Sequence, residues 1–290
     1  MNLQRASAAR GGAAAEVRYP SLAGRVVLVT GGSRGLGRAM ALALAAQGAR
    51  VAITGREDGA ALGASAAALA ERAGPGRTLA IVADVCSPPA CAATVERVRA
   101  AFGRLDVLVN NAGLGMRSIS ESYMEEPPGF WTADLEAWRA IVDTNLNGAF
   151  YMARAAVPGM IAQGFGKLIN ISTSDGVLSR RGLAPYGPSK AALESMSQIW
   201  ARDLEGTGVD VNVFLPGAAT DTDILPDSRR AQGNMLPAEI MAPGILWLCA
   251  DESNGRSGGR YVARLWDEAL PPDEAAVQAS RPLSLGCVPG

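Results

Sequence analysis

The side chains best suited to acid–base chemistry are Tyr186 and Lys190, in the segment Tyr-Gly-Pro-Ser-Lys. The residues from Ser189 onward are typical of a helix, and two helical side chains four positions apart lie on one face. A free phenol has a pKa of about 10, and a nearby ammonium favours the phenolate, which brings the group closer to acid–base chemistry at neutral pH. The same spacing is common on helices without a function, so further residues must support a catalytic role.

The 290-residue chain contains no histidine. Its absence excludes histidine triads, histidine metal ligands and a histidine base, so acid–base work near neutral pH must come from tyrosine, lysine, cysteine or a carboxylate. The four cysteines, Cys86, Cys91, Cys249 and Cys287, lack C-x-x-C spacing. That usage fits a reducing cytoplasm better than a disulfide scaffold or a zinc site. We therefore expect a cytoplasmic protein without a metal.

Charge and hydropathy exclude two classes of partner. The 27 Lys and Arg residues nearly balance the 28 Asp and Glu residues, which argues against nucleic acid or an anionic membrane as a partner. No segment approaches the roughly 18 consecutive apolar residues of a membrane helix. Residues 1–20 lack the apolar run of a secretory signal, and we expect a disordered tail there, with a transit peptide as the alternative.

The first regular unit is a strand at 26–29, a glycine-rich turn at 30–37 and a helix to about Gln47. Glycines let a backbone approach a pyrophosphate, and the N-terminus of the following helix presents free N–H groups to it. The spacing is G-x-x-x-G-x-G and not the G-x-G-x-x-G of the dinucleotide fingerprint. A phosphate-binding unit is the favoured interpretation, and a tight turn without a ligand is the alternative.

The alternation of strand and helix continues to a short final strand at 260–263. Nearly all-apolar strands that alternate with helices predict a parallel sheet covered on both faces. We therefore expect one α/β domain with a Rossmann fold, a doubly wound parallel sheet of about seven strands, over residues 21–270, followed by an irregular extension at 271–290. The further strands are expected at 50–54, 78–83, 105–109, 167–171, 209–215 and 260–263.

Polar residues follow several of these strands. Right-handed crossovers place Thr30, Thr54, Asp84 and Asn110 along one edge of the sheet, where such sheets bind ligands. Two segments without a clear period, 114–131 and 218–236, are expected to form loops that shape the pocket at that edge. A helix is expected to begin near Thr132, with Thr132 as its N-cap.

The ordered set of motifs resembles the short-chain dehydrogenase/reductase family over about residues 22–265. Members of this family share a single-domain Rossmann fold and reduce carbonyls or oxidise alcohols with a nicotinamide cofactor. The matching motifs are TGGSRGLG for TGxxxGxG, Asp84-Val85, NNAG at 110–113, Asn145, the NIS run at 170, YGPSK for YxxxK, and Pro216-Gly217.

The resemblance implies a role for four catalytic residues. Tyr186 would protonate the carbonyl oxygen, or act as the base in the reverse direction. Lys190 would lower the Tyr186 pKa and hold the ribose hydroxyls, and Asn145 would position a water between Lys190 and solvent. The family usually has a serine thirteen residues before the tyrosine, and here that position is Thr173, whose hydroxyl can donate the same hydrogen bond to substrate.

The resemblance also implies a cofactor site. Gly55 stands where selectivity for NAD(H) would place an acid, and Arg34 and Arg56 could bind a 2′-phosphate, so NADP(H) is favoured over NAD(H). The alternative is that Glu57 or Asp58 binds the ribose. The expected cofactor-binding residues are Gly31, Ser33, Arg34, Gly35, Leu36, Gly37, Arg56, Asp84, Val85, Asn111, Ala112, Gly113, Tyr186, Lys190, Pro216, Gly217 and Thr222, with Thr220 as the alternative to Thr222.

We therefore expect an NADPH-dependent oxidoreductase that reduces a small-molecule carbonyl to an alcohol or runs the reverse reaction. An NAD-linked polyol dehydrogenase and a non-catalytic nucleotide-binding sensor or scaffold are the alternatives. Family members usually pair two long helices, here 144–163 and 186–204, so a homodimer or homotetramer is expected. Burial of their apolar residues against the chain's own sheet is the alternative, and these residues are Phe150, Val157, Met160, Leu193, Met196 and Trp200.

Overall fold

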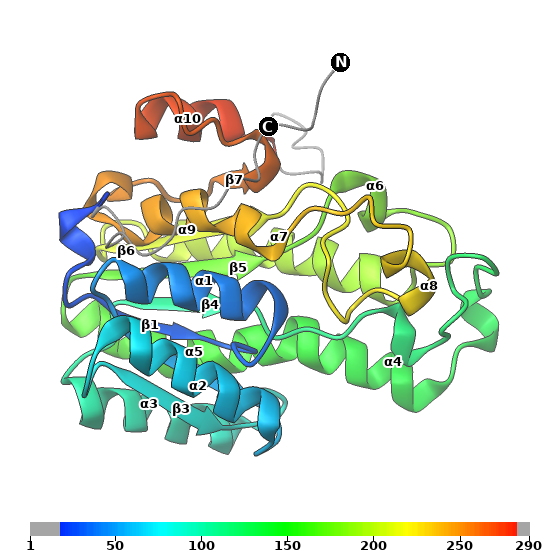
Figure 1. Ribbon diagram of the computed structural model, residues 1–290, viewed down its shortest axis with the longest axis horizontal. Helices are drawn as coiled ribbons and strands as arrows, with labels where there is room; N and C mark the ends of the chain where they lie inside the picture. Colours follow the sequence, from blue (N-terminus) through cyan, green and yellow to red (C-terminus); the bar gives the residue numbers. More distant parts are fainter. Residues whose placement is uncertain (1–17, 283–290) are drawn as a thin grey trace.

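The computed structural model describes residues 18–282 and shows one parallel sheet of seven strands with helices on both faces (Figure 1). The strand order is β3-β2-β1-β4-β5-β6-β7, and every neighbouring pair is parallel. This confirms the predicted doubly wound Rossmann fold. The strands are β1 (Val26–Val29), β2 (Arg50–Gly55), β3 (Thr78–Val82), β4 (Val107–Asn110), β5 (Gly166–Ile171), β6 (Val209–Leu215) and β7 (Arg260–Val262).

Ten α-helices connect or follow these strands in the described part of the chain. Two of them, α6 and α8, are single turns inside longer loops. The helices are α1 (Gly35–Ala46), α2 (Ala60–Ala73), α3 (Pro88–Phe102), α4 (Leu135–Val142), α5 (Gly148–Ala162), α6 (Asp175–Leu178), α7 (Tyr186–Asp203), α8 (Asp227–Arg230), α9 (Ala242–Cys249) and α10 (Pro272–Ala279).

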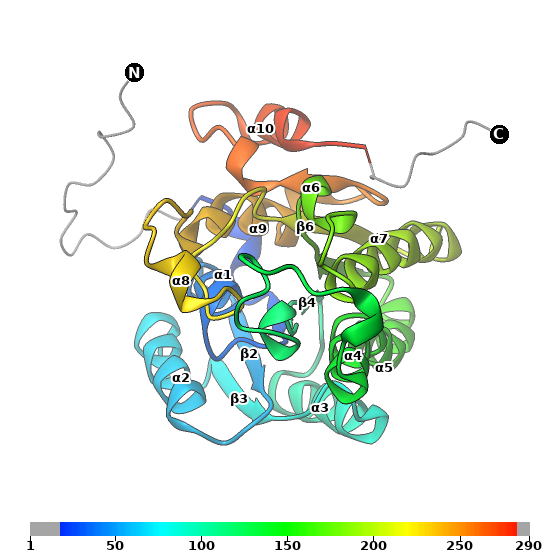
Figure 2. The same ribbon diagram turned by 90° about the vertical axis from the view of Figure 1, so that its right-hand side faces the viewer.

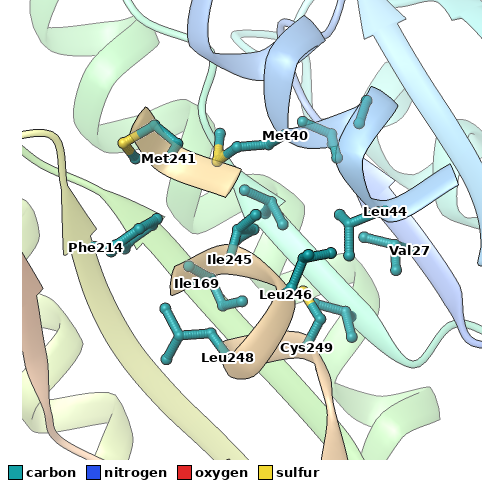
Figure 3. Packing of buried hydrophobic residues seen from close by; sticks show 14 of the residues in the cluster. Val27, Met40, Leu44, Ile169, Phe214, Met241, Ile245, Leu246, Leu248 and Cys249 are labelled. Carbon is teal, nitrogen blue, oxygen red and sulfur yellow. The ribbon is translucent and has the colours of Figure 1, made fainter. Parts of the chain in front are cut away.

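The apolar strands are buried on both faces, which is why they lack polar alternation. In β1, Val27 and Val29 belong to one core, whereas Val26 and Leu28 belong to the other. The first core is filled from α1 and α9, where Met40, Leu44, Ile245 and Leu246 converge (Figure 3). The second core is filled from α3, α5 and α7. Two cores of this kind hold the sheet rigidly and fix the positions of its strand ends.

The strand order changes direction at β1. The next strands along the chain, β2 and β3, lie on one side of β1, and β4 lies on the other side. In such sheets the crevice for a ligand opens beyond the carboxyl ends of the strands at this switch point. Figure 2 looks at the molecule from that edge, where the loop segments 114–131 and 218–236 cross in front of the sheet. These two excursions lie where the sequence predicted pocket walls.

The helix predicted to begin near Thr132 begins later. Residues 130–132 form a 3₁₀ turn, and the Thr132 hydroxyl donates to the carbonyl of Gly129 at 2.9 Å, so it does not cap a helix. Asp134 is the N-cap of α4, because its carboxylate accepts from the backbone N–H of Ala137 at 2.9 Å. Both residue types are good caps, and the local turn decides between them.

The irregular extension predicted for residues 271–290 is wrong for its first part, because residues 272–279 form α10. Pro272 occupies the first helical position, where the missing N–H costs no hydrogen bond, so the two prolines begin a helix and do not prevent one. Ala275, Ala276 and Ala279 of α10 are buried in the first core.

Only the last three residues of the tail predicted at 1–20 lie within the described part of the chain. Residues 1–17 and Cys287 lie outside the described residues, whereas Tyr19 is 1% exposed and a 3₁₀ turn covers Pro20–Leu22. The predicted tail therefore does not extend to residue 20. Between residues 18 and 282, no helix has the length and apolar character needed to cross a membrane.

The packing of α10 predicts a sharp contrast between two neighbouring positions. Ala275→Glu should lower the free energy of unfolding by at least about 2 kcal/mol, because it forces a larger, charged side chain into a filled core. Val277→Glu, on the same helix but at a position 70% exposed, should change it by less than about 0.5 kcal/mol. Urea unfolding measures both, and equal effects would show that α10 does not pack as described.

Candidate active site

A cavity of about 940 Å³ opens at the carboxyl edge of the sheet. The ends of β1, β2, β4, β5 and β6 form its floor, and the segments around 114–118 and 218–225 form its walls. Most of the predicted site residues line it: Gly31, Ser33, Arg34, Gly35, Leu36, Arg56, Asp84, Val85, Asn111, Ala112, Gly113, Thr173, Tyr186, Lys190, Pro216, Thr220 and Thr222.

Three predicted residues, Gly37, Gly217 and Asn145, do not line the cavity. A Cβ at Gly37 would lie 2.4 Å from the carbonyl oxygen of Gly31, so this glycine lets α1 approach the glycine turn. Gly217 has a φ of 92°, and a Cβ there would lie 2.4 Å from the side chain of Val262. Both glycines shape the walls of the cavity, and neither reaches into it.

Tyr186 is the first residue of α7, and its hydroxyl hydrogen-bonds the side chain of Thr173 beyond the end of β5. Burial raises the pKa of Tyr186 to about 12, and the hydrogen bond to Thr173 opposes that shift. The phenol therefore carries its proton at neutral pH, as a free phenol does, and it loses that proton only at a higher pH than a free phenol. The start of α7 at Tyr186 agrees with the helix predicted at 186–204.

Lys190 lies one turn along α7 from Tyr186, and its ammonium donates to the backbone carbonyl of Ile171 at 2.8 Å. Burial lowers the pKa of Lys190 to about 8, and the carboxylate of Glu194 opposes that shift. Burial is the main cause of the raised pKa of Tyr186, and the predicted lowering of this pKa by Lys190 stays a prediction. The lysine thus hydrogen-bonds the last residue of β5, two residues before Thr173.

Asn145 lies in a π-helical turn, Asp143–Asn147, between α4 and α5. Its amide nitrogen donates to the carbonyl of Leu114 at 3.0 Å and to the hydroxyl of Ser189 at 3.1 Å, and its amide oxygen accepts from the N–H of Leu114 at 2.8 Å. Both amide protons are thus used within the protein. The side chain ties the 114–131 segment to α7, and its predicted role with a water stays a prediction.

Comparison with known proteins identifies the family. The sequence profile of the short chain dehydrogenase family matches residues 25–233. The chain belongs to the short-chain dehydrogenase family. It is 33% identical over 240 residues to the 3-oxoacyl-[acyl-carrier-protein] reductase FabG of Escherichia coli. The matched region covers 79% of this chain and 91% of that relative.

A second FabG relative, from Thermotoga maritima, is 33% identical over 249 residues and covers 82% of this chain and 95% of the relative. Among solved structures, a short-chain type dehydrogenase/reductase from Mycobacterium marinum superimposes with a TM-score of 0.73 at 28% identity, over 83% of this chain and 94% of that chain. This short-chain dehydrogenase is thus an NAD(P)(H)-dependent oxidoreductase by family.

The residues of this short-chain dehydrogenase fit a dinucleotide. Arg34 is the N-cap of α1 and makes no side-chain cap, so the first N–H groups of α1 remain available beside the glycine turn. Uncapped N–H groups and a positive helix end suit a pyrophosphate. Within residues 18–282, no group of three or more His, Cys, Asp and Glu side chains could hold a metal ion.

Both arginines expected to select the cofactor lie on the cavity, and each has a carboxylate partner. Arg34 pairs with Asp223 at 3.2 Å, and Arg56 pairs with Glu57 at 3.2 Å. Gly55 is the last residue of β2, so no acid occupies that strand end. Each of the two arginines on this side of the cavity is therefore paired with an acid, Asp223 for Arg34 and Glu57 for Arg56.

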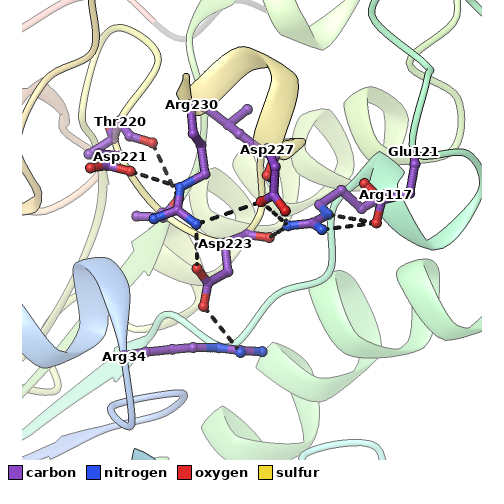
Figure 4. A network of polar contacts seen from close by, with 10 residues as sticks. Arg34, Arg117, Glu121, Thr220, Asp221, Asp223, Asp227 and Arg230 are labelled. Carbon is purple, nitrogen blue, oxygen red and sulfur yellow. Dashed lines mark hydrogen bonds and ion pairs between the residues drawn. The ribbon is translucent and has the colours of Figure 1, made fainter. Parts of the chain in front are cut away.

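An ion-pair network ties the 218–236 loop to the rest of the site (Figure 4). Arg230 pairs with Asp221 at 2.9 Å and with Asp223 at 3.0 Å, and Asp223 also pairs with Arg34 of the glycine turn. Arg117 donates to the carbonyls of Asp223 and Leu225 at 3.2 and 3.1 Å. A single exposed ion pair contributes little to stability. This network, however, joins the glycine turn, the 114–118 segment and the 218–236 loop around the cavity.

The sequence did not reveal the apolar part of the cavity. Met116, Tyr123 and Leu183 form a small cluster with Val177 and Tyr186 at its margin, and all five line the cavity. The break in the strand and helix pattern marked the region of Met116 and Tyr123 as a loop near the site. Leu183 and Val177 follow the polar run at 172–174 without any periodic signal that could have identified them.

Proposed function

We propose that this short-chain dehydrogenase is an NADPH-dependent carbonyl reductase in which Tyr186 protonates the carbonyl oxygen of the substrate. The observation that carries the proposal is the partly buried Tyr186, whose hydroxyl is hydrogen-bonded to Thr173 on the wall of the cavity. A phenol with a pKa of about 12 keeps its proton at neutral pH and can donate it to a developing alkoxide. The same groups serve the reverse oxidation if the phenol first loses its proton.

The remaining side chains of the site position the reaction. The Thr173 hydroxyl donates a hydrogen bond to the substrate oxygen beside Tyr186, which fixes where that oxygen lies. Lys190 holds the end of β5 through the carbonyl of Ile171 and places a positive charge at the foot of the cavity. The nicotinamide, when bound, supplies the hydride, and the protein supplies position and the proton.

The cavity favours a substrate with an apolar body. Met116, Tyr123, Val177 and Leu183 form an apolar cluster with Tyr186 on the cavity wall, so an alkyl or ring substituent on the ketone would bury against them. The 3-oxoacyl reductase names of two relatives support an oxoacyl substrate of this kind. A polyol would leave its hydroxyls unpaired on this wall, which disfavours the polyol dehydrogenase.

The free energy needed to bury a charged side chain in this cavity argues against a sensor or scaffold without activity. Burial lowers the pKa of Lys190 to about 8, so at neutral pH folding must supply the free energy that it takes to bury the charged ammonium. A protein that only bound a nucleotide would have no chemical use for these groups. Their retention in one cavity supports an enzyme.

We also propose a homodimer or homotetramer. Of the apolar residues predicted on the two long helices, Met160 and Leu193 are buried in the chain itself, as the alternative required. Phe150 and Ile161 on α5 and Ile199 on α7 remain 41%, 43% and 54% exposed. Apolar side chains of this size on two helices supply surface for a second copy of the chain.

Tyr186→Phe should lower kcat by at least about 100-fold, because it removes the proton donor while keeping the ring. Thr173→Ser should stay within a few-fold of the parent, because it keeps the hydroxyl. NADPH absorbance with a panel of apolar ketones and 3-oxoacyl esters measures the rates. Tyr261→Phe, a tyrosine outside the cavity, is the matched control. Near-normal turnover by Tyr186→Phe would refute the mechanism.

Arg34→Ala and Arg56→Ala should each raise KM for NADPH by about tenfold and leave KM for NADH little changed. The reason is that a charge-assisted hydrogen bond to a 2′-phosphate contributes about 1.5–3 kcal/mol. Arg38→Ala, an exposed arginine on α1 outside the cavity, is the control. The assignment to NADPH fails if the ratio of kcat/KM for the two cofactors is the same in the parent and the double variant.

A further inference from the structure

A buried ion pair lies directly behind the catalytic residues. Arg260 of β7 is 2% exposed, and Glu194 of α7 is fully buried. The guanidinium Nε of Arg260 donates to both carboxylate oxygens of Glu194, each at 3.1 Å. Glu194 lies one turn after Lys190 and two turns after Tyr186 on the same helix.

The other contacts of this pair converge on the end of β5. The carboxylate of Glu194 accepts from the hydroxyl of Ser172 at 2.6 Å. The Nη2 of Arg260 donates to the backbone carbonyl of Thr173 at 3.2 Å, and it also donates to Asp175. The backbone N–H of Ser172 donates to the carbonyl of Phe214 on β6 at 2.9 Å. The backbone is therefore held at the N–H of Ser172 and at the carbonyl of Thr173.

Stability alone gives little reason for such a pair. Removing two charges from water costs several kcal/mol per ion, and apolar replacements of similar volume are often as stable. A buried ion pair does impose one geometry, because the planar fork of arginine fits only certain acceptors. The geometry it imposes here is that of the backbone at residues 172 and 173.

The backbone geometry at this position determines the direction in which the Thr173 hydroxyl points. A β-branched side chain has few allowed χ1 rotamers, so the direction of its hydroxyl follows the backbone. A serine at this position could rotate to correct a displaced backbone, whereas Thr173 has less freedom to do so. Thr173 thus needs a more rigid support than the serine usual in the family.

We propose that Arg260 and Glu194 are positioning residues that aim the Thr173 hydroxyl at Tyr186 and at the substrate oxygen. This inference rests on the role proposed for Thr173 in the function above. The pair touches neither substrate nor cofactor, and it acts through the backbone of residues 172 and 173.

Arg260→Lys tests the proposal with the least disturbance. Lysine keeps the positive charge beside Glu194, but its single ammonium cannot also reproduce the forked contacts to Thr173 and Asp175. We expect kcat for ketone reduction to fall between about 10- and 100-fold, as for a catalytic group displaced by about 1 Å, with the Kd of NADPH from fluorescence titration unchanged. The double variant Arg260→Gln/Glu194→Gln removes both charges together and serves if the single variant does not fold.

Arg25→Lys is the matched control. Arg25 is another largely buried arginine, which pairs with Asp251 and lies 4.5 Å from the centroid of the Phe165 ring. It directly precedes β1, so it lies at the amino ends of the strands, whereas the cavity opens at their carboxyl ends. This variant should lose a similar amount of thermal stability and keep its kcat. A loss of kcat in Arg25→Lys equal to that in Arg260→Lys would overturn the proposal, because general destabilisation would then explain both.

The decisive readout is rescue by serine. Thr173→Ser introduced into Arg260→Lys should recover most of the lost kcat, because the serine hydroxyl can rotate back toward Tyr186. A purely structural ion pair would give no such recovery. The proposal is wrong if Arg260→Lys retains the parent kcat, or if Thr173→Ser fails to restore it.

A crystal structure of the Arg260→Lys variant separates this inference from the proposed function. If the parent reduces no ketone in the panel, the carbonyl reductase proposal fails, and the placement of Thr173 still tests the positioning. Displacement of the Thr173 hydroxyl beyond hydrogen-bond distance from Tyr186 supports it. An unchanged hydroxyl position overturns it.

Discussion

The hydrogen bond between Tyr186 and Thr173 requires that the start of α7 meet the segment just after β5, although the loop and short helix of residues 172–185 connect these two elements. β5 lies between β4 and β6, so its end is fixed by strands on both sides. The burial that this contact needs also raises the pKa of Tyr186 to about 12. The rest of the site, including the ammonium of Lys190 and the pair of Arg260 with Glu194, serves to hold these two hydroxyls together.

Much of the fold follows from short-range patterns in the sequence. Runs such as Val26–Val29 are apolar because both faces of the sheet are covered, and their spacing predicted the strands of a Rossmann fold. Polar strand ends, from Thr30 to Asn110, predicted the edge at which the cavity opens. Asp134 in place of Thr132 as a cap, and α10 behind two prolines, show where local signals allow more than one outcome.

The direction of individual side chains could not be predicted, because it depends on partners far away in the chain. Lys190 lies at the predicted spacing from Tyr186, yet its ammonium bonds the carbonyl of Ile171. Glu194 and Arg260 are 66 residues apart, and Arg34 and Asp223 are 189 apart. Charge counts and motif spacing carry no information on such pairs, which form only after the sheet has brought β7, α7 and the loops together.

Burial raises the pKa of Tyr186 above that of a free phenol, and an NMR titration of the tyrosine side chains tests this shift most directly. With ¹³C-labelled tyrosine, the Cζ resonance missing in Tyr186→Phe identifies Tyr186 among the five tyrosines of the chain. This resonance should keep its neutral position beyond the pH at which exposed tyrosines ionise, about 10, consistent with a pKa of about 12. Ionisation of Tyr186 at or below the pKa of a free phenol would contradict it.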